Sequence, residues 1–534
     1  MKRCPTCART YSDERQNFCL DDGAWLVDES VTPDQQTAIL ASLDANALES
    51  QTRIFQADPS RAMTISMSGY RPNSIAVLPF AHLSSDPDDE YFCDGLAEEL
   101  INALSRVDDL KVVARTSAFS FRGKNIDIAQ VGALLNVNNV VEGSVRKFGD
   151  RMRISVQLIN TADGYNVWSD KYDTEMRDIF DVQDEITRSV VKALKTKLLG
   201  DEEKQEDQTT GFTEQFKQTA HDVEAYKHFL RGRFFLNKFT PGNFYKALDC
   251  FGEAIAIDAN FADAYAGLAD AHMMLTEMGP VPPHEAMPKA KEAALKALSL
   301  DSELSEAYSS LALVQQDYEY DFAAAERSYL RAIELNPNSS LARQGYALLL
   351  AQLGRHDEAR EEFKKTLNVD PLSVVGNWVY SFGLFMAERY DRCIEQANKA
   401  LELDPNFPAA YLSLAFAHHL KGEHAESIEA YAKCQELSGS AETASIIRES
   451  FRNGGWQGFL QKMAAPDGPF GITAYIVAVM RAALGDAEGA IDKLEESFER
   501  REPHIVMMKV DPRFDEIGDN ERFRALVRSV GFPD

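Results

Sequence analysis

The sequence has few cysteines, no long apolar run and a shortage of basic residues. It contains 7 cysteines among 534 residues, and 56 lysines and arginines against 84 aspartates and glutamates, so its formal net charge is −28. This negative charge repels nucleic acid and anionic membranes at long range, and we expect binding to neither. A membrane-spanning helix needs about 18 or more consecutive apolar residues, and no stretch of the sequence approaches that length.

The motifs of several enzyme classes are also missing. The sequence contains no GxGxxG, no GxxxxGKS/T, no HExxH and no GxSxG at a strand-to-helix turn. The N-terminal MKRCPTC lacks the apolar core of a secretory signal, and the later cysteines are scattered singly, which favours a reducing cytoplasm. With 45% hydrophobic and 26% charged residues, the composition is that of an ordinary globular protein. We therefore predict a cytoplasmic protein without catalytic activity.

Composition and periodicity divide the chain into segments. Residues 27–73 are polar, and residues 199–220 include the acidic run DEEKQEDQ, so we interpret both as flexible linkers. Between them, residues 74–198 predict an α/β domain with a mixed sheet. In this segment the buried-strand run SIAVLPF precedes a helical pattern, and three strand-like runs, NVVEGSVRKF, RMRISVQLIN and YNVWSDKYD, follow at tight turns. An amphipathic helix over about 178–198 closes the segment.

Residues 221–534 are predicted to be helical, and their pattern repeats every 34 residues. Pro337, Pro371 and Pro405 follow this spacing, as do the small residues Ala325 and Ala359. Each period predicts two antiparallel helices, which bury their apolar faces only when the pairs stack into a solenoid. The pattern resembles the tetratricopeptide repeat (TPR), with about seven copies between 222 and 504. The resemblance implies an all-α superhelical solenoid that binds other proteins, with NERFRALVRSVGF as a capping helix.

Residues 1–26 carry CPTC at 4–7 and then Phe18–Gly23, and they resemble a small zinc ribbon found at the N-termini of some bacterial signalling proteins. The resemblance implies one structural Zn2+ per chain, held by Cys4, Cys7, Cys19 and Asp22. So short a segment has too little apolar core to fold alone, and bound metal would supply the missing free energy. Because an aspartate stands at the fourth position, the alternative is a decayed site with free cysteines.

Residues 74–198 resemble the TolB-like N-terminal domain, which often precedes TPRs in bacterial regulators. The resemblance rests on SIAVLPFAHLSSDPDDEYFCDGLAEELINALSRVDDLKVVARTSAFSFRGKN, on VVEGSVRKFGDRMRISVQLINTADGYNVWSDKYD and on FDVQDEITRSVVKAL. It implies an interaction or sensory domain that brings no active site. The acidic residues Asp94, Glu98 and Glu99 on its first helix are interpreted as charges that favour a helix N-terminus.

Basic residues are concentrated in this domain more than elsewhere in the acidic chain. They either line an anion or partner site at the sheet edge or are outward residues of a hairpin and a loop. They are Arg115, Arg122, Lys124, Arg146, Lys147, Arg151 and Arg153.

In the TPR family, partners commonly lie along the concave face formed by the first helix of each pair. The positions that correspond to that groove in the fifth and sixth repeats are Trp378, Phe382, Phe385, Phe416 and His419. Such aromatic residues either bind a partner or pack against neighbouring helices. We therefore predict an adaptor or scaffold in bacterial signalling or regulation, which binds apolar or amphipathic protein segments. The alternative is a regulator whose α/β domain binds a small molecule or anion and whose repeats transmit the signal.

Overall fold

The computed structural model describes residues 73–83, 89–107, 109–124, 126–148, 151–175, 179–199, 222–238, 240–277, 281–465 and 473–533. It also places three short strands, β1 (Lys2–Arg3), β2 (Thr10–Tyr11) and β3 (Val27–Asp28), in one antiparallel sheet with β1 in the middle. The predicted zinc ligands Cys4, Cys7, Cys19 and Asp22 lie outside the described residues, as does nearly all of the two predicted linkers.

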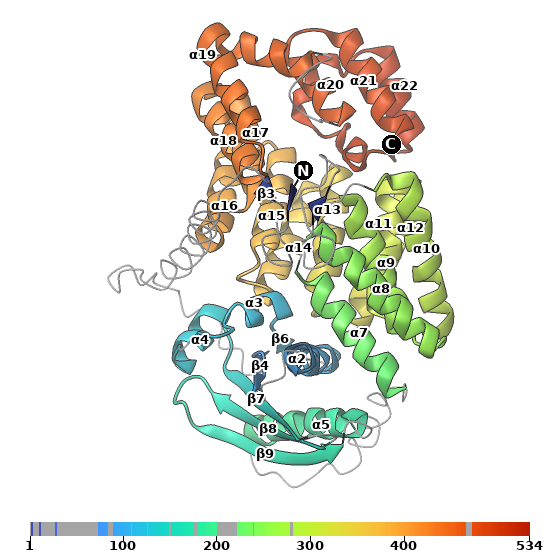
Figure 1. The fold of residues 1–534 in the computed structure, drawn as a ribbon. Coiled ribbons are helices and arrows are strands. Elements are labelled where there is room, and N and C mark those ends of the chain that lie inside the picture. The colour runs from blue at the N-terminus through green and yellow to red at the C-terminus, as the bar shows by residue number, and fades with distance from the viewer. Residues whose placement is uncertain are drawn as a thin grey trace.

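One mixed sheet forms the centre of the α/β domain (Figure 1). Its strands are β4 (Ser74–Val77), β5 (Ala81–His82), β6 (Lys111–Val112), β7 (Asn139–Phe148), β8 (Arg151–Asn160) and β9 (Asn166–Glu175). The strand order is β6-β4-β7-β8-β9, with β5 also paired to β7. The pairings of β4 and β5 are parallel, whereas β7, β8 and β9 are antiparallel. The predicted small mixed-sheet domain is therefore confirmed.

Helices cover the two faces of this sheet unequally. Helices α2 (Asp89–Ser105) and α5 (Ile179–Leu199) cover one face, where Val141, Ile154 and Leu158 are buried in the same core as both helices. On the other face, α3 (Arg115–Phe119) and α4 (Ile128–Leu135) form a smaller core with Ala76 of β4, Val140 of β7 and Val113, which directly follows β6. Because side chains alternate along a strand, the polar residues of β7, β8 and β9 point to this second face. Within the described residues no helix covers them.

The solenoid consists of antiparallel helix pairs that stack side by side (Figure 1). Glycines Gly354 and Gly422 have φ of +77° and +76° in the turns between paired helices, which is the left-handed region that glycine adopts at little cost. The pairs are α7 (Val223–Leu236) with α8 (Pro241–Ile257), α9 (Ala262–Glu277) with α10 (Pro283–Leu300), α11 (Ser305–Val314) with α12 (Phe322–Leu335), α13 (Ser340–Gln352) with α14 (His356–Val369), α15 (Val374–Met386) with α16 (Tyr390–Leu403), and α17 (Pro408–Leu420) with α18 (His424–Leu437).

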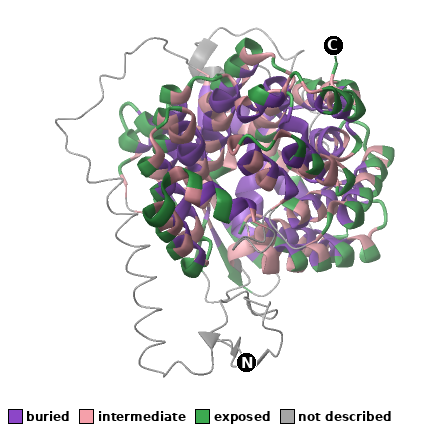
Figure 2. Cartoon of the chain, turned by 90° about the horizontal axis from the view of Figure 1, so that it is seen from above, coloured by how far each residue is buried: buried purple, intermediate pink, exposed green. Residues whose placement is uncertain are grey.

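The C-terminal part folds back onto the third helix pair. It contains α19 (Ala441–Ala464), α20 (Ala474–Ala483), α21 (Ala487–Glu499), the 3-10 turns η4 (Pro503–Met507) and η5 (Pro512–Ile517), and α22 (Glu521–Val530). Phe532 stacks on Phe322 with ring centroids 5.0 Å apart, and Arg501 Nη1 donates to the carbonyl of Tyr318 at 2.7 Å. Figure 2 shows exposed positions mainly on the outer side of the helix layers. No helix that the structure describes is long and apolar enough to cross a bilayer.

Candidate functional site

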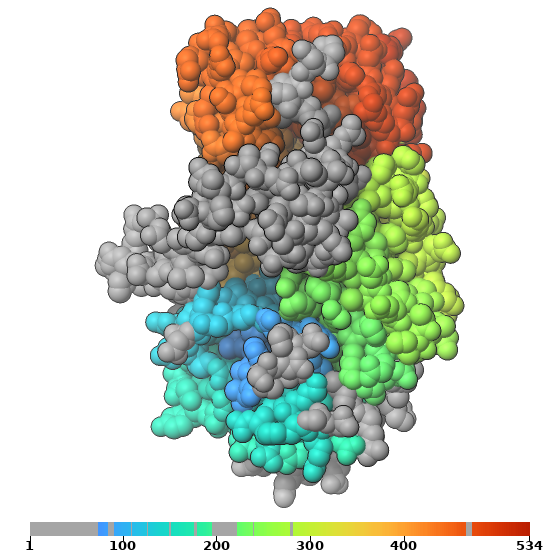
Figure 3. All heavy atoms as spheres, viewed as in Figure 1, coloured from blue at the N-terminus to red at the C-terminus, as the bar shows by residue number. Residues whose placement is uncertain are grey.

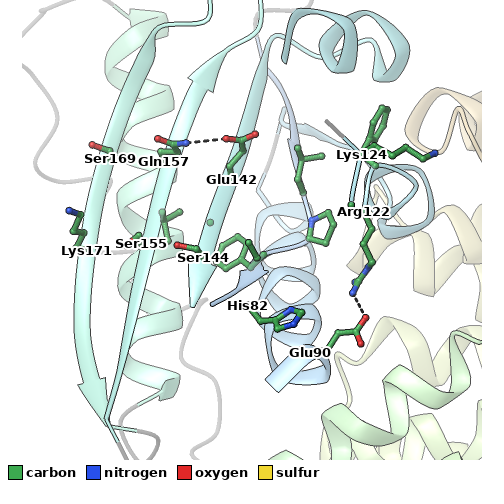
Figure 4. Close-up of a pocket in the computed structure, with 18 of the residues that line it drawn as sticks. His82, Glu90, Arg122, Lys124, Glu142, Ser144, Ser155, Gln157, Ser169 and Lys171 are labelled. Atoms are coloured by element: carbon green, nitrogen blue, oxygen red, sulfur yellow. Dashed lines mark hydrogen bonds and ion pairs between the residues drawn. The ribbon is translucent and has the colours of Figure 1, made fainter. Parts of the chain in front are cut away.

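The uncovered face of the sheet forms the floor of a pocket of about 1030 Å³ (Figure 4). One wall is the segment 78–82, which runs from β4 into β5, and the other is the segment 121–124, which follows α3. The floor contains two neighbouring rows of side chains. Glu142, Gln157 and Ser169 lie opposite one another across β7, β8 and β9, and Ser144, Ser155 and Lys171 form the next row.

The floor is polar and the walls contribute apolar surface. Gln157 Nε2 donates to Glu142 Oε2 at 3.0 Å, which joins the two residues across β7 and β8. Leu78 and Pro79 of the first wall are half-buried and contribute apolar surface. Within the described residues, no group of three or more His, Cys, Asp or Glu side chains is placed to hold a metal ion. The lining therefore offers hydrogen-bonding groups and apolar surface to a small ligand.

An interdomain interface joins the α/β domain to the first helix pair of the solenoid, and the space-filling view shows the two parts in contact (Figure 3). On the apolar side, a Cβ at Gly95 of α2 would lie 2.5 Å from the Leu230 side chain of α7, so glycine permits close contact of the two helices. Gln183 Nε2 of α5 donates to the hydroxyl of Tyr226 at 2.7 Å, and the Phe180 and Tyr226 rings lie 4.6 Å apart. Residues of α2, α5 and α7 therefore share one core.

A buried ion network lies beside this core. Glu98 of α2 forms an ion pair with Arg115, whose Nε lies 2.9 Å from the carboxylate, and it accepts a hydrogen bond from Arg233 Nε of α7 at 3.0 Å. Burial alone would raise the pKa of Glu98, but the charges of Arg233 and Arg115 outweigh burial and hold the pKa below its ordinary value. The interpretation of Glu98 and Glu99 as charges at a helix N-terminus was wrong, because α2 begins at Asp89 and both residues lie past its middle.

Polar residues in the turns of the solenoid fix the other end of the interface. Asn338 Nδ2 donates to the carbonyls of Ser105 and Leu110 at 3.1 and 3.0 Å, and Asn338 Oδ1 accepts from Val112 N at 3.2 Å. Ser117 of α3 donates through its hydroxyl to Asp370 Oδ1 at 2.5 Å. Both solenoid residues adjoin a proline of the 34-residue period, Asn338 after Pro337 and Asp370 before Pro371. The only sign of these interdomain contacts in the sequence was that asparagine and aspartate, which can form hydrogen bonds, stand beside the repeat prolines.

The structure divides the predicted basic residues between separate places. Arg115 and Arg122 are paired with acids of α2: Arg122 Nη1 lies 2.8 Å from Glu90, and Arg122 also contacts Asp94. Arg146, Arg151 and Arg153 lie at the far end of the β7–β8 hairpin, where Arg153 pairs with Asp173 at 2.6 Å. Lys147 is opposite the buried Met152 and thus belongs to the other face. Lys124 lies on the pocket wall, so the seven residues form no single patch.

The predicted groove aromatics are mostly covered by the protein's own C-terminal part. Phe385 and Phe416 are only 1% and 6% exposed, and the Arg513 guanidinium of η5 lies 5.2 and 4.1 Å from their ring centroids. The structure therefore buries these two residues within the chain, with Arg513 of η5 against both rings. His419 packs on Trp456 at 4.7 Å. Trp378 and Phe382 are half-buried and retain accessible surface.

Glu99 gives the interdomain interface a dependence on pH. Burial raises the pKa of its carboxyl to about 8, and the negative charges of Asp263 on α9 and of Glu98 add to this. Because the folded chain then holds the proton more tightly than the unfolded chain, the corresponding stability is present below the ordinary pKa of 4.5 and is lost as pH rises through about 8. Above that pH, ionised Glu99 repels Glu98 and Asp263.

We therefore expect Glu99 to lower the melting temperature of the full chain as pH rises from about 5 to about 8, and Glu99→Gln to reduce that slope. Melting curves by circular dichroism at several pH values measure the effect. Glu449→Gln, on an exposed position of α19, is the matched control and should keep the wild-type slope. An unchanged slope in Glu99→Gln would contradict the assignment.

Two family models match the chain. The model of the second domain of HilA/YgeH-like transcriptional regulators matches residues 71–189, and the tetratricopeptide repeat model matches residues 320–371 and 384–441. Among curated proteins, "Putative adenylate cyclase 3" of Rhizobium meliloti (strain 1021) is 40% identical over 197 residues, which cover 37% of this chain and 32% of that protein. The transcriptional regulator HilA of Salmonella paratyphi A (strain ATCC 9150 / SARB42) is 27% identical over 147 residues, which cover 28% of this chain and 26% of that protein.

This chain thus spans about a third and about a quarter of the length of these two relatives. Among solved structures, the match to YrrB, described as a TPR protein with an unusual peptide-binding site, has 22% identity and a TM-score of 0.25. It covers 41% of this chain and 98% of that one. The C-terminal part of the chain therefore carries tetratricopeptide repeats, and its α/β domain is similar to the second domain of HilA/YgeH-like transcriptional regulators.

Proposed function

We propose that this protein is a non-enzymatic regulatory adaptor, in which the TPR solenoid binds partner proteins and carries the α/β domain at a fixed position. The observation that supports it best is the interdomain interface, where Glu98 meets Arg233 and Asn338 meets Ser105 and Leu110. An α/β domain held by buried polar contacts keeps one orientation relative to any protein bound along the repeats. Its likeness to a domain of transcriptional regulators supports a role in regulation.

Ligand sensing by the α/β domain is a second candidate function, favoured by the position of α3. Ser117 of this helix is bonded to Asp370 of the solenoid, and residues 121–124 directly after the helix form one wall of the pocket. A ligand that moves residues 121–124 therefore acts on a segment that is continuous with α3, and α3 is hydrogen-bonded to the solenoid through Ser117 and Asp370. The TolB-like resemblance fits this sensory role and stays a hypothesis, since the matching family model is the HilA/YgeH-like one.

Catalysis is not part of the proposal. The relative named as an adenylate cyclase shares 197 residues, which are 32% of its length, so its named activity need not lie in the shared part. TPRs are interaction scaffolds in which each helix pair contributes surface. Nucleotide turnover by the purified protein would overturn this element of the proposal.

Partner binding is tested at Trp378, which is half-buried on α15 and lies 5.8 Å from Phe407. If this surface binds partners, Trp378→Ala should weaken the affinity by roughly thirtyfold, because truncating an aromatic hot spot costs about 2 kcal/mol or more. The partner is captured by cross-linking in the native host, purified and titrated against wild-type and variant protein. A melting curve on each variant separates lost contact from lost folding.

The control is Leu330→Ala, which removes an exposed apolar side chain from the outer helix α12 and should leave binding unchanged. If Trp378→Ala changes neither binding nor melting, the partner surface lies elsewhere on the solenoid. If it lowers the melting temperature strongly, Trp378 is a core residue.

A structural Zn2+ held by Cys4, Cys7, Cys19 and Asp22 remains part of the proposal, and nothing in the described residues bears on it. Metal analysis under reducing, chelator-free conditions tests it. Wild-type protein should carry zinc and Cys4→Ser should not, whereas absence of zinc from both would remove this element.

A further inference from the structure

The floor of the pocket has hydrogen-bonding capacity that the protein itself leaves unused. The Glu142 carboxylate is half-buried and accepts from Gln157 Nε2, which occupies one of its roughly four acceptor positions. Ser144 and Ser155 lie opposite each other in the adjacent row, and Ser169 lies opposite Gln157. None of these three serine hydroxyls takes part in a hydrogen bond within the part of the chain that the structure describes.

The charged residues around the pocket do not favour an anion. Arg122 is held by Glu90 and Asp94 of α2, so its charge is already matched. Figure 4 shows Lys171 at the outer edge of the sheet on β9 and Lys124 extending away from the sheet. Glu142 places a carboxyl group on the β7 side of the floor, next to Gln157, and this acidic group disfavours a phosphate or carboxylate ligand.

The remaining lining suits a ligand with polar edges and an apolar face. Leu78 and Pro79 are half-buried and contribute apolar surface to the lining, while the carboxylate, the amide and the serine hydroxyls line the floor. A sugar ring has this composition, because its hydroxyls lie around the rim and its C–H groups form a flat apolar surface. The volume of about 1030 Å³ exceeds what a single ring fills and accommodates two.

We propose that this pocket binds a neutral polyhydroxylated small molecule, of the size of a mono- or disaccharide. Ligand hydroxyls donate to the Glu142 carboxylate, and the hydroxyls of Ser144 and Ser155 bond to neighbouring ligand oxygens. The proposal rests on the second candidate function and specifies its ligand. Binding against residues 121–124 restrains the segment that continues back into α3 and its bond to Asp370.

The first experiment titrates the full-length protein with glucose, galactose, maltose and sucrose, followed by calorimetry and ligand-observed NMR. Glutamine and glucose 6-phosphate represent zwitterionic and anionic ligands. We expect at least one of the four sugars to bind more tightly than either of these two. If none of the four binds, or if glucose 6-phosphate or glutamine binds more tightly, the proposal is overturned.

The second experiment tests the residues. Glu142→Gln keeps the shape of the side chain and removes its charge, so the affinity for the sugar should fall by roughly tenfold with an unchanged melting curve. Ser155→Ala should lower it by a smaller factor. Glu175→Gln changes a carboxylate at the far end of β9, outside the pocket, and is the matched control with unchanged affinity. Equal affinity of the wild type and Glu142→Gln would place the ligand elsewhere and overturn the assignment.

A third measurement separates the ligand site from the regulatory role. Hydrogen exchange of the full chain is compared with and without the sugar that binds. Slower exchange in residues 114–124 together with 369–373 supports both the site and its coupling to the solenoid. Sugar binding that depends on Glu142 without any change in 369–373 retains the site and contradicts ligand sensing.

Discussion

Phe416→Ala is expected to lower the free energy of unfolding of the C-terminal part of the solenoid by about 3–5 kcal/mol. The ring is buried between Phe385 at 5.6 Å and Tyr431 at 6.0 Å, and the Arg513 guanidinium covers it at 4.1 Å. Truncation leaves a cavity among these groups and also removes a desolvated cation–π contact. Urea unfolding followed by circular dichroism measures the loss as a lower transition midpoint.

Leu341→Ala is the control, because this residue of α13 is 61% exposed and should change stability by less than about 0.5 kcal/mol. A similarly small loss for Phe416→Ala would show that the ring faces an open groove in solution, as one of the two interpretations from sequence held. The loss in the free energy of unfolding of Phe416→Ala therefore distinguishes a core residue from a residue on a partner-binding surface.

The second large effect is expected for Asp511→Ala, which should lower the free energy of unfolding by about 3–5 kcal/mol. Asp511 accepts from Arg513 Nε at 2.8 Å and Nη2 at 2.6 Å, and from the Tyr475 hydroxyl at 2.8 Å. Both side chains of the ion pair are only 2% exposed. Removal of the carboxylate leaves the guanidinium charge buried without a partner, which costs more than the pair itself contributes.

Two comparisons make the second prediction specific. Asp519→Ala removes a carboxylate that is 98% exposed and paired with Arg524, and it should cost no more than about 1 kcal/mol. The double variant Asp511→Ala with Arg513→Met removes the uncompensated charge and should recover part of the stability lost by Asp511→Ala alone. If the double variant is less stable than the single one, the contacts of Arg513 with the aromatic rings stabilise the fold by more than its unpaired buried charge destabilises it.

Local patterns in the sequence predicted the architecture well where they repeat or alternate. The period of 34 residues places small residues where helices touch, and Ala325 and Ala359 are both buried as expected. The three strand-like runs between turn residues correspond to β7, β8 and β9, and the middle run, RMRISVQLIN, alternates polar and apolar residues. In contrast, β5 and α3 have two and five residues, too few to carry any period.

The interdomain interface could not be predicted in this way. Asn338 bonds to a residue 233 positions earlier, and Asp370 to one 253 positions earlier, and no periodicity records such a pairing. The packing of Phe385 and Phe416 could not be predicted for a related reason. Family analogy gave no sign that η5 would place Arg513 against these two rings. The polar floor of the pocket was not predicted either, and its two walls come from loops.

The return of the C-terminal part onto the third helix pair has a mechanical consequence. An open array of repeats behaves like a spring, since each unit touches only its neighbours and small rotations add up along the axis. Here Arg501 and Phe532 join the last units to Tyr318 and Phe322, so a stretch between them would have to break these contacts. Between the third pair and the end, this array is therefore a closed frame of fixed width rather than an elastic element.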